Sequence, residues 1–298
     1  MTAPVLADAL GPRARRRTLV ASAVVTVAIL FILWVGFGRL VDKGQLTGAK
    51  WDPVFDGATL RFLAGGLGNT VKVALAAMVL AIAIGGLMAL GRLARNAPLR
   101  WATGAYVEFF RAMPLLLLIL FAAVAMPIYD LRPGPPFREL TYLLLGLTIY
   151  NSAVLGEIFR AGILSLDRGQ MEAASALGLR YWAAMWLVVI PQAVRRMVPA
   201  IVSQLVTLLK DTSLAWVLGL AVGDMELLRR AKSLGEFYGN PLQFYSTVAV
   251  VYIVINFALS RLARWLEVRQ RRRYSASSIS VAGVEDLAVM AAEGEARV

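Results

Sequence analysis

Two adjacent ionisable residues inside an apolar segment are the first candidates for chemistry in this chain. Lys210 and Asp211 lie in the segment 198–222, which is otherwise largely apolar. A charged side chain at the centre of a bilayer-spanning helix costs about 2.5 to 3.5 kcal/mol on insertion scales, so it needs a partner or a water-filled cavity. Adjacent residues of a helix do not face each other. Lys210 and Asp211 are therefore predicted not to pair with each other within one helix.

A stripe of polar residues accompanies this pair. At helical spacing Gln204, Thr207 and Asp211 share one face, and Lys210 lies on a neighbouring face. The stripe has two open interpretations. It could line a path for a polar substrate, or it could join helices by hydrogen bonds while the charged pair caps a helix break. Asn151, an amide in the apolar segment 140–164, is a further candidate with the same alternatives.

Two similar acid and base pairs form a second group of candidates. Glu108 and Arg111 are three residues apart, as are Glu157 and Arg160, and each pair lies near one end of an apolar segment. An i, i+3 ion pair adds about 0.2 to 0.5 kcal/mol to a helix. The two pairs could latch a cytoplasmic gate, or they could anchor helix ends at the membrane surface.

Composition excludes several classes of chemistry and of partner. The 298 residues include no Cys and no His, which excludes disulfides, thiol nucleophiles, zinc sites built on those ligands and a His general base. Hydrophobic residues make up 59% of the chain and its mean hydropathy is +0.66, so it is predicted to be a membrane protein. The formal charge of +12 comes from basic residues beside apolar segments, which argues against nucleic-acid binding.

Six apolar segments are long enough to cross a hydrocarbon core, which takes about 20 helical residues. We expect an all-α integral membrane protein with six transmembrane helices, and Pro114 is expected to kink the third. The predicted spans are 19–40, 70–90, 105–128, 140–164, 198–222 and 245–266. The predicted regions are a basic cytoplasmic N-tail (1–18), an extra N-terminal transmembrane helix (19–40), an external loop (41–68), a core of five helices (69–268) and a basic, then disordered, cytoplasmic tail (269–298).

Arginine and lysine accumulate on the cytoplasmic side of membrane proteins, which gives the expected orientation. The loops predicted to be inside carry the larger basic clusters, so both termini are expected in the cytoplasm. These clusters are Arg13 and Arg15 to Arg17, then Arg92, Arg95 and Arg100, then Arg168, Arg180, Arg195 and Arg196, then Arg269 and Arg271 to Arg273.

The cytoplasmic segment 165–191, called the coupling segment below, includes the water-compatible stretch GQMEAASALGLR. Its residues 171–177 are strong helix formers, and Gly178 suits a left-handed C-terminal cap. A second helical segment is expected to run to Pro191. The small surface of Ala173 and Ala174, with the Glu172 carboxylate, could receive a partner protein, or the segment could be a solvated amphipathic helix.

This segment resembles the signature of permease subunits of ATP-binding-cassette (ABC) importers. That signature reads E-A-A, three residues, G, nine residues, I-x-L-P, and it aligns with 172–174, Gly178 and the VVIP of 188–191. Neighbouring stretches are similar to the polar amino-acid permeases over roughly residues 66–270. They are GNT at 68–70, FRAMPLL at 110–116, EIFRAGILSLDRGQMEAA at 157–174, PQAVRRMVP at 191–199 and LLKDTSLAWVLGL at 208–220. The extra first helix most resembles the larger permease subunit of glutamate importers.

The resemblance implies a type I ABC importer permease fold in the cytoplasmic membrane of a prokaryote. It implies three partners: a second permease subunit, identical or different, a cytoplasmic ABC ATPase dimer docked at Glu172, Ala173, Ala174 and Gly178, and an extracytoplasmic substrate-binding protein. The chain has no G-x-x-x-x-G-K-[ST] loop, so ATP and Mg²⁺ would be bound by the ATPase, and no cofactor or metal is expected in this chain.

The expected function is import of a polar amino acid, with glutamate as the first choice and glutamine or arginine as alternatives. Two rival classes remain. An ion-coupled secondary carrier would show paired broken helices in an inverted repeat, which the sequence lacks. An intramembrane enzyme would need a converging acid and nucleophile, and none is evident.

Overall fold

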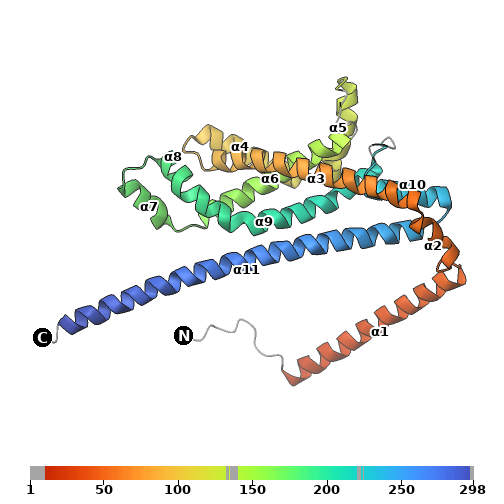
Figure 1. Ribbon diagram of the computed structural model, residues 1–298, viewed down its shortest axis with the longest axis horizontal. Coiled ribbons are helices and arrows are strands. Elements are labelled where there is room, and N and C mark those ends of the chain that lie inside the picture. The colour runs from red at the N-terminus through yellow and green to blue at the C-terminus, as the bar shows by residue number, and fades with distance from the viewer. Residues whose placement is uncertain (1–10, 132–133, 135–139, 220–222, 224, 296–298) are drawn as a thin grey trace. The chain divides into compact units, whose positions relative to one another are not determined.

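The computed structural model describes residues 11–131, 134, 140–219, 223 and 225–295, and its regular elements in these ranges are all helices (Figure 1). The chain divides into two compact units, Met1–Asp56 and Gly57–Val298. The predicted N-tail residues 1–10, the end of the predicted fifth span at 220–222 and the tail residues 296–298 lie outside the described residues.

The first unit contains α1 (Pro12–Asp42) and α2 (Gly48–Phe55). Pro12 stands in the first turn of α1, where its missing N–H would have no helical partner. Gly44, with φ of 60°, turns the chain after α1. The helix includes the predicted span 19–40 and begins earlier, through the arginine cluster.

The second unit begins with α3 (Gly57–Arg92), which is longer than the sequence predicted. Residues 57–68, which include Gly65 and Gly66, were expected in an external loop. Glycine weakens a helix by about 1 kcal/mol relative to alanine. Here both glycines lie inside α3, where they make room for a side chain from another helix, as described below.

The predicted third span is broken where the sequence predicted only a kink. α4 (Ala97–Ala112) and α5 (Leu115–Ile128) meet at an angle of 100°. The side chain of Asn96 accepts a hydrogen bond from the Leu99 N–H and caps the start of α4. Pro114 is the N-cap of α5, and its ring cannot continue the helix that ends at Ala112. The expectation of one helix over 105–128 is therefore wrong.

Next come α6 (Leu140–Leu164) and the helices of the coupling segment, α7 (Arg168–Ala176) and α8 (Tyr181–Ala184). A π-helical turn, η1 (Met185–Val189), joins α8 to α9 (Ile190–Asp211), and the 3₁₀ turn η2 (Thr212–Val217) follows. The prediction that a helix ends at Pro191 is wrong. Proline lies in the first turn of α9, where its missing N–H costs little, and the π turn before it keeps the path helical.

The chain ends with α10 (Leu227–Tyr238) and α11 (Pro241–Glu295), separated by Gly239 in the left-handed region with φ of 68°. The sequence predicted a basic stretch from residue 269 and then, after Arg273, a mostly disordered tail with room for one weak helix, whereas α11 continues to Glu295. The tail to that residue contains no proline, and its alanine and glutamate residues favour helix.

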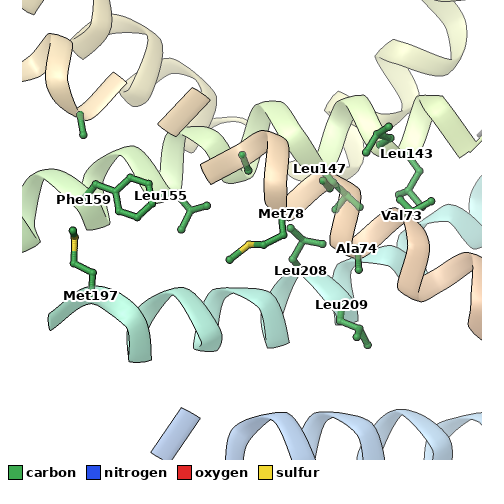
Figure 2. Packing of buried hydrophobic residues seen from close by; sticks show 14 of the residues in the cluster. Val73, Ala74, Met78, Leu143, Leu147, Leu155, Phe159, Met197, Leu208 and Leu209 are labelled. Carbon is green, nitrogen blue, oxygen red and sulfur yellow. The ribbon is translucent and has the colours of Figure 1, made fainter. Parts of the chain in front are cut away.

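The core of the second unit lies between α3, α6 and α9 (Figure 2). α3 and α6 approach closely because Gly85 faces the backbone of α6, where a Cβ atom would lie 2.8 Å from the Ser152 carbonyl oxygen. Buried side chains fill the space between the three helices; among them are Val73, Ala74, Met78, Leu143, Leu147, Leu155, Phe159, Met197 and Leu208.

Within the described ranges, five helical segments are long and apolar enough to cross a membrane, and the bent pair α4 and α5 raises the number to as many as six. The five are Arg13–Asp42, Gly57–Arg92, Leu140–Leu164, Tyr181–Val217 and Pro241–Leu266.

Candidate functional site

The coupling segment presents part of its predicted docking surface. Asp167 caps α7 by accepting a hydrogen bond from the Gly169 N–H at 2.9 Å. Gly178 has φ of 82°, which confirms the predicted left-handed cap, and nothing lies within 4 Å of where its Cβ would be. Glycine is thus required there for backbone conformation, not for space.

The signature residues 172–174 do not all face outward. Glu172 and Ala173 are exposed, and Leu177 is 83% exposed. Ala174 is only 3% exposed, so its methyl group packs within the chain and offers no surface to a partner. The placement of Ala174 on the docking surface therefore needs correction. Successive residues of a helix point about 100° apart, so one alanine can face outward while the next faces the chain, and the sequence alone did not separate them.

Contacts tie the coupling segment to the long helices. The Tyr181 hydroxyl donates to the Leu93 carbonyl oxygen at 3.2 Å, and the Arg95 guanidinium lies 4.9 Å from the centre of the Tyr181 ring. The Gln192 side chain donates to that of Gln170 at 2.9 Å and so links α9 to α7. These contacts connect α7 and α8 with the junction between α3 and α4, which lies at the same end of the unit (Figure 1).

The acid and base pairs form a network around Arg92, at the end of α3. Its guanidinium lies 2.6 Å from the Glu157 carboxylate and 3.6 Å from that of Glu108. Glu157 also pairs with Arg160 at 2.6 Å, as the i, i+3 spacing predicted. In the part of the chain that the structure describes, Glu108 makes no ion pair with Arg111, so that predicted pair is wrong.

The helix-spacing argument missed Arg92 because it compares only residues of one helix. Arg92 brings together three helices, α3, α4 and α6, through two acids. Its position at the end of an apolar run was a signal that it could meet acids at neighbouring helix ends.

The polar residues of α9 lie in two different environments, one against α6 and one facing α11. The Gln204 side chain donates to the Asn151 side-chain oxygen at 2.7 Å, and Asn151, which is 0% exposed, donates to the Leu147 carbonyl oxygen at 2.8 Å. These two amides therefore join α6 to α9. Thr207 and Lys210 instead line a hollow between α9 and α11, and Asp211 is the last residue of α9.

A buried polar cluster joins α10 to α3 and α11. The Asn69 side chain donates to the carbonyl oxygens of Gly223 and Met225, at 2.9 and 3.1 Å. The Thr70 hydroxyl accepts from the Leu227 N–H at 3.1 Å. These contacts give the GNT stretch at 68–70 a structural role, because Asn69 and Thr70 hold the turn that leads into α10.

Glu226 is the cap of α10 and is 0% exposed. Its carboxylate accepts from the N–H groups of Leu228 and Arg229, each at 2.6 Å, and from the Tyr252 hydroxyl of α11 at 3.4 Å. Burial raises the pKa of Glu226 to about 7, although the backbone donors oppose this change.

Arg230 fills the space left by the two glycines of α3. Its guanidinium donates to the carbonyl oxygens of Phe62, at 2.6 Å, and Met225, at 3.1 Å, and lies 4.5 Å from the centre of the Phe62 ring. A Cβ atom at Gly65 would lie 2.6 Å from this guanidinium, and one at Gly66 would lie 2.7 Å from the Arg230 side chain. Burial lowers the pKa of Arg230. No sequence pattern indicated this contact, which joins residues far apart in the chain.

Metal binding has no structural support in the residues described. Among them, no group of three or more acidic residues could hold a metal ion, and the chain has no His or Cys.

Comparison with known proteins identifies the family. Residues 81–272 match the family described as "Binding-protein-dependent transport system inner membrane component". The chain is 37% identical over 248 residues, 83% of this chain and 89% of the relative, to the glutamate transport system permease protein GluD of Corynebacterium glutamicum. It is 36% identical to the glutamate/aspartate import permease protein GltK of Escherichia coli O6:H1 and 38% identical to the probable glutamine ABC transporter permease protein GlnP of Bacillus subtilis, in each case over 71% of this chain and 94% of the relative.

A solved structure supports the same fold. An amino acid ABC transporter, crystallised with histidines, matches with a TM-score of 0.63 and 28% sequence identity, over 70% of this chain and 94% of that chain. The predicted all-α, type I ABC importer permease fold is confirmed. The match of residues 81–272, the relatives and the apolar helices together show that this multi-pass membrane chain belongs to the family of binding-protein-dependent transport system inner membrane components, as a polar amino-acid permease subunit of an ABC importer.

Proposed function

We propose that this chain is the membrane-spanning subunit through which an ATP-driven importer moves glutamate into the cell. The coupling segment carries the mechanical part of this proposal. It presents the exposed Glu172, Ala173 and Leu177, ends α7 at the left-handed Gly178, and is tied through Tyr181 to the junction of α3 and α4. A partner that pushes on α7 would move these helices together.

The partners follow from this arrangement and from the family. A cytoplasmic ATPase dimer docks on α7 and supplies the energy by binding ATP with Mg²⁺, since this chain has no phosphate-binding loop. A second permease subunit completes the path, and a substrate-binding protein delivers the amino acid from outside. The coupling segment and both termini lie in the cytoplasm, in keeping with the distribution of Arg and Lys.

Relatives named for glutamate support that substrate. GluD and GltK are named for glutamate or for glutamate and aspartate, whereas GlnP, at similar identity, is named for glutamine. Thr207, Lys210 and Asp211 are the candidate path residues, and the Lys210 ammonium suits an acidic substrate. Asn151 and Gln204 contribute to the path indirectly, by holding α6 against α9, because their amides are already hydrogen-bonded to each other.

Uptake of radiolabelled glutamate by cells with and without the gene tests the substrate. We expect uptake that disappears with the gene and resists excess unlabelled glutamine or arginine. Strong competition by glutamine would assign glutamine as the substrate in place of glutamate. Import that persists in ATP-depleted cells would instead favour an ion-coupled carrier.

Docking of the ATPase is tested separately by co-purification. Gly178→Asp places a side chain at a left-handed φ, and Glu172→Ala removes the exposed carboxylate, so each is expected to reduce the ATPase that co-purifies with the permease. Phe237→Ala is the control, since Phe237 is 80% exposed on α10, far along the unit from α7 (Figure 1). Undiminished co-purification with both variants would refute docking at α7.

A further inference from the structure

A hollow between α9 and α11 gathers polar groups from both helices. Its volume is about 310 Å³, at the lower end of the range of about 300 to 1,000 Å³ that is usual for small-molecule sites. The lining residues are Pro199, Ser203, Val206, Thr207 and Lys210 of α9, and Ser260, Ala263 and Arg264 of α11. We call it the α9–α11 hollow.

Two cations share this hollow, and none of its lining residues that the structure describes is acidic. Lys210 comes from α9 and Arg264 from α11, and neither side chain forms an ion pair within 4 Å among the described residues. Both lie in segments long and apolar enough to span a membrane. An unpaired charge is costly there, more for Lys210 than for Arg264, which lies two residues before the end of its segment, and two like charges in one hollow also repel each other. A bound anion would offset both costs.

Hydroxyl groups complete the lining. Ser203 and Thr207 come from α9 and Ser260 from α11, and the Thr207 hydroxyl donates to the Ser203 carbonyl oxygen at 3.3 Å. A guanidinium binds a carboxylate with two parallel hydrogen bonds, whereas an ammonium acts as a compact point charge. The combination of Arg264, Lys210 and the hydroxyls of Ser203 and Ser260 therefore suits a carboxylate better than a neutral amide.

We propose that the α9–α11 hollow is a binding site for a carboxylate group, and that Arg264 together with Lys210 selects an acidic amino acid over its amide. This inference rests on the proposed function and assigns it a selective residue on α11, a helix that the sequence did not connect with substrate. A phosphate group of an anionic lipid shares the relevant chemistry and is the other source of an anion at this position.

Direct binding of radiolabelled glutamate tests the site, using the purified permease and ATPase complex without the substrate-binding protein. Arg264→Gln and Lys210→Gln are each expected to weaken glutamate binding by about 10- to 100-fold, as expected for loss of one charge-assisted contact, while leaving glutamine binding unchanged. Arg264→Lys retains the charge but loses the paired hydrogen bonds, so it is expected to fall between Arg264→Gln and the natural chain.

Arg261→Gln is the matched control. Arg261 is three residues before Arg264 on α11, stacks over the Phe257 ring at 5.0 Å and does not line the hollow. It should bind glutamate as the natural chain does. Co-purification of the ATPase with every variant shows that the complex has assembled. Equal glutamate binding by Arg264→Gln and Arg261→Gln would overturn the inference.

Native mass spectrometry of phosphatidylglycerol retained by the same complexes separates the two sources of the anion. Loss of lipid in Arg264→Gln with unchanged glutamate binding would overturn the selective role and assign the hollow to a lipid phosphate. The assignment of glutamate as the physiological substrate can be refuted without refuting the carboxylate site. If cells show no gene-dependent glutamate uptake but Arg264→Gln still weakens glutamate binding to the complex, the carboxylate site stands and the physiological substrate is another acid.

Discussion

Glu226→Gln should remove most of the dependence of the protein's stability on pH between about 4.5 and 7. Glu226 is 0% exposed, and burial raises its pKa from 4.5 to about 7. Below pH 4.5 the carboxyl is protonated in both the folded and the unfolded chain. Between 4.5 and 7 only the folded chain keeps the proton, so the free energy of unfolding decreases as the pH rises through this window.

The size of the effect follows from the difference in pKa. Each pKa unit corresponds to about 1.36 kcal/mol, so the folded protein loses about 3 kcal/mol of stability between acidic and neutral pH through this group. For a chain of this size, that corresponds to a fall of the thermal midpoint on the order of 5 to 10 °C. The substituted amide has no proton to lose in this range and keeps one oxygen to accept from the α10 backbone.

Thermal unfolding of the detergent-solubilised protein, followed by tryptophan fluorescence at several pH values, measures this difference. The midpoint of the natural chain should fall with rising pH, and that of Glu226→Gln should stay nearly level. Glu236→Gln is the control, because the Glu236 side chain is 66% exposed on the same helix and pairs with Lys232 only at 3.9 Å. Parallel pH profiles for the natural chain and Glu226→Gln would refute the reasoning.

Three further predictions concern packing and the polar contacts. Gly66→Ala should lower the free energy of unfolding by about 1 to 3 kcal/mol, because its Cβ would lie 2.7 Å from the Arg230 side chain and 3.0 Å from the Leu227 backbone. Gly68→Ala, with nothing within 4 Å of its Cβ, should be neutral or slightly stabilising, and thermal unfolding distinguishes the two variants. Double-mutant cycles should give a coupling energy of about 1 kcal/mol for Arg92 with Glu157, and near zero for Arg92 with the 75% exposed Glu108; equal values would contradict the geometry. Gln204→Leu should cost about 1 to 3 kcal/mol of stability by leaving the Asn151 oxygen unpaired, without changing the ratio of glutamate to glutamine uptake; a changed ratio would return this residue to the substrate path.

Local signals predicted those features that depend on a few neighbouring residues. The left-handed cap at Gly178 follows from a glycine after a run of helix formers, and the apolar runs predicted the long helices. Pro114 and Pro191 are both prolines in apolar runs, yet one breaks a span by 100° and the other lies in a continuous helix. What differs is the π turn before Pro191, which no residue type specifies.

Contacts between distant segments account for what the sequence could not predict. Gly65 and Gly66 look like loop residues until Arg230, from α10, is seen to occupy the space beside them. Lys210 has no visible connection with Arg264 until α9 and α11 lie together. In both cases the partner is on another helix, and spacing along one helix carries no information about it.

The π turn at Met185–Val189 absorbs one residue of chain length without changing the direction of the helices on either side. A π turn contains one residue more than an α turn but closes the same full rotation, so deleting one residue there would leave an ordinary α turn and keep the directions of α7 and α8 around the axis of α9. Each residue of an α-helix turns the chain by about 100°, so deleting one residue from the neighbouring α-helical part of α9 would instead rotate α7 and α8 by about that angle. Glu172 and Ala173 would then face a different direction with their own structure intact. A one-residue change of length is therefore expected to be tolerated at the π turn and not beside it.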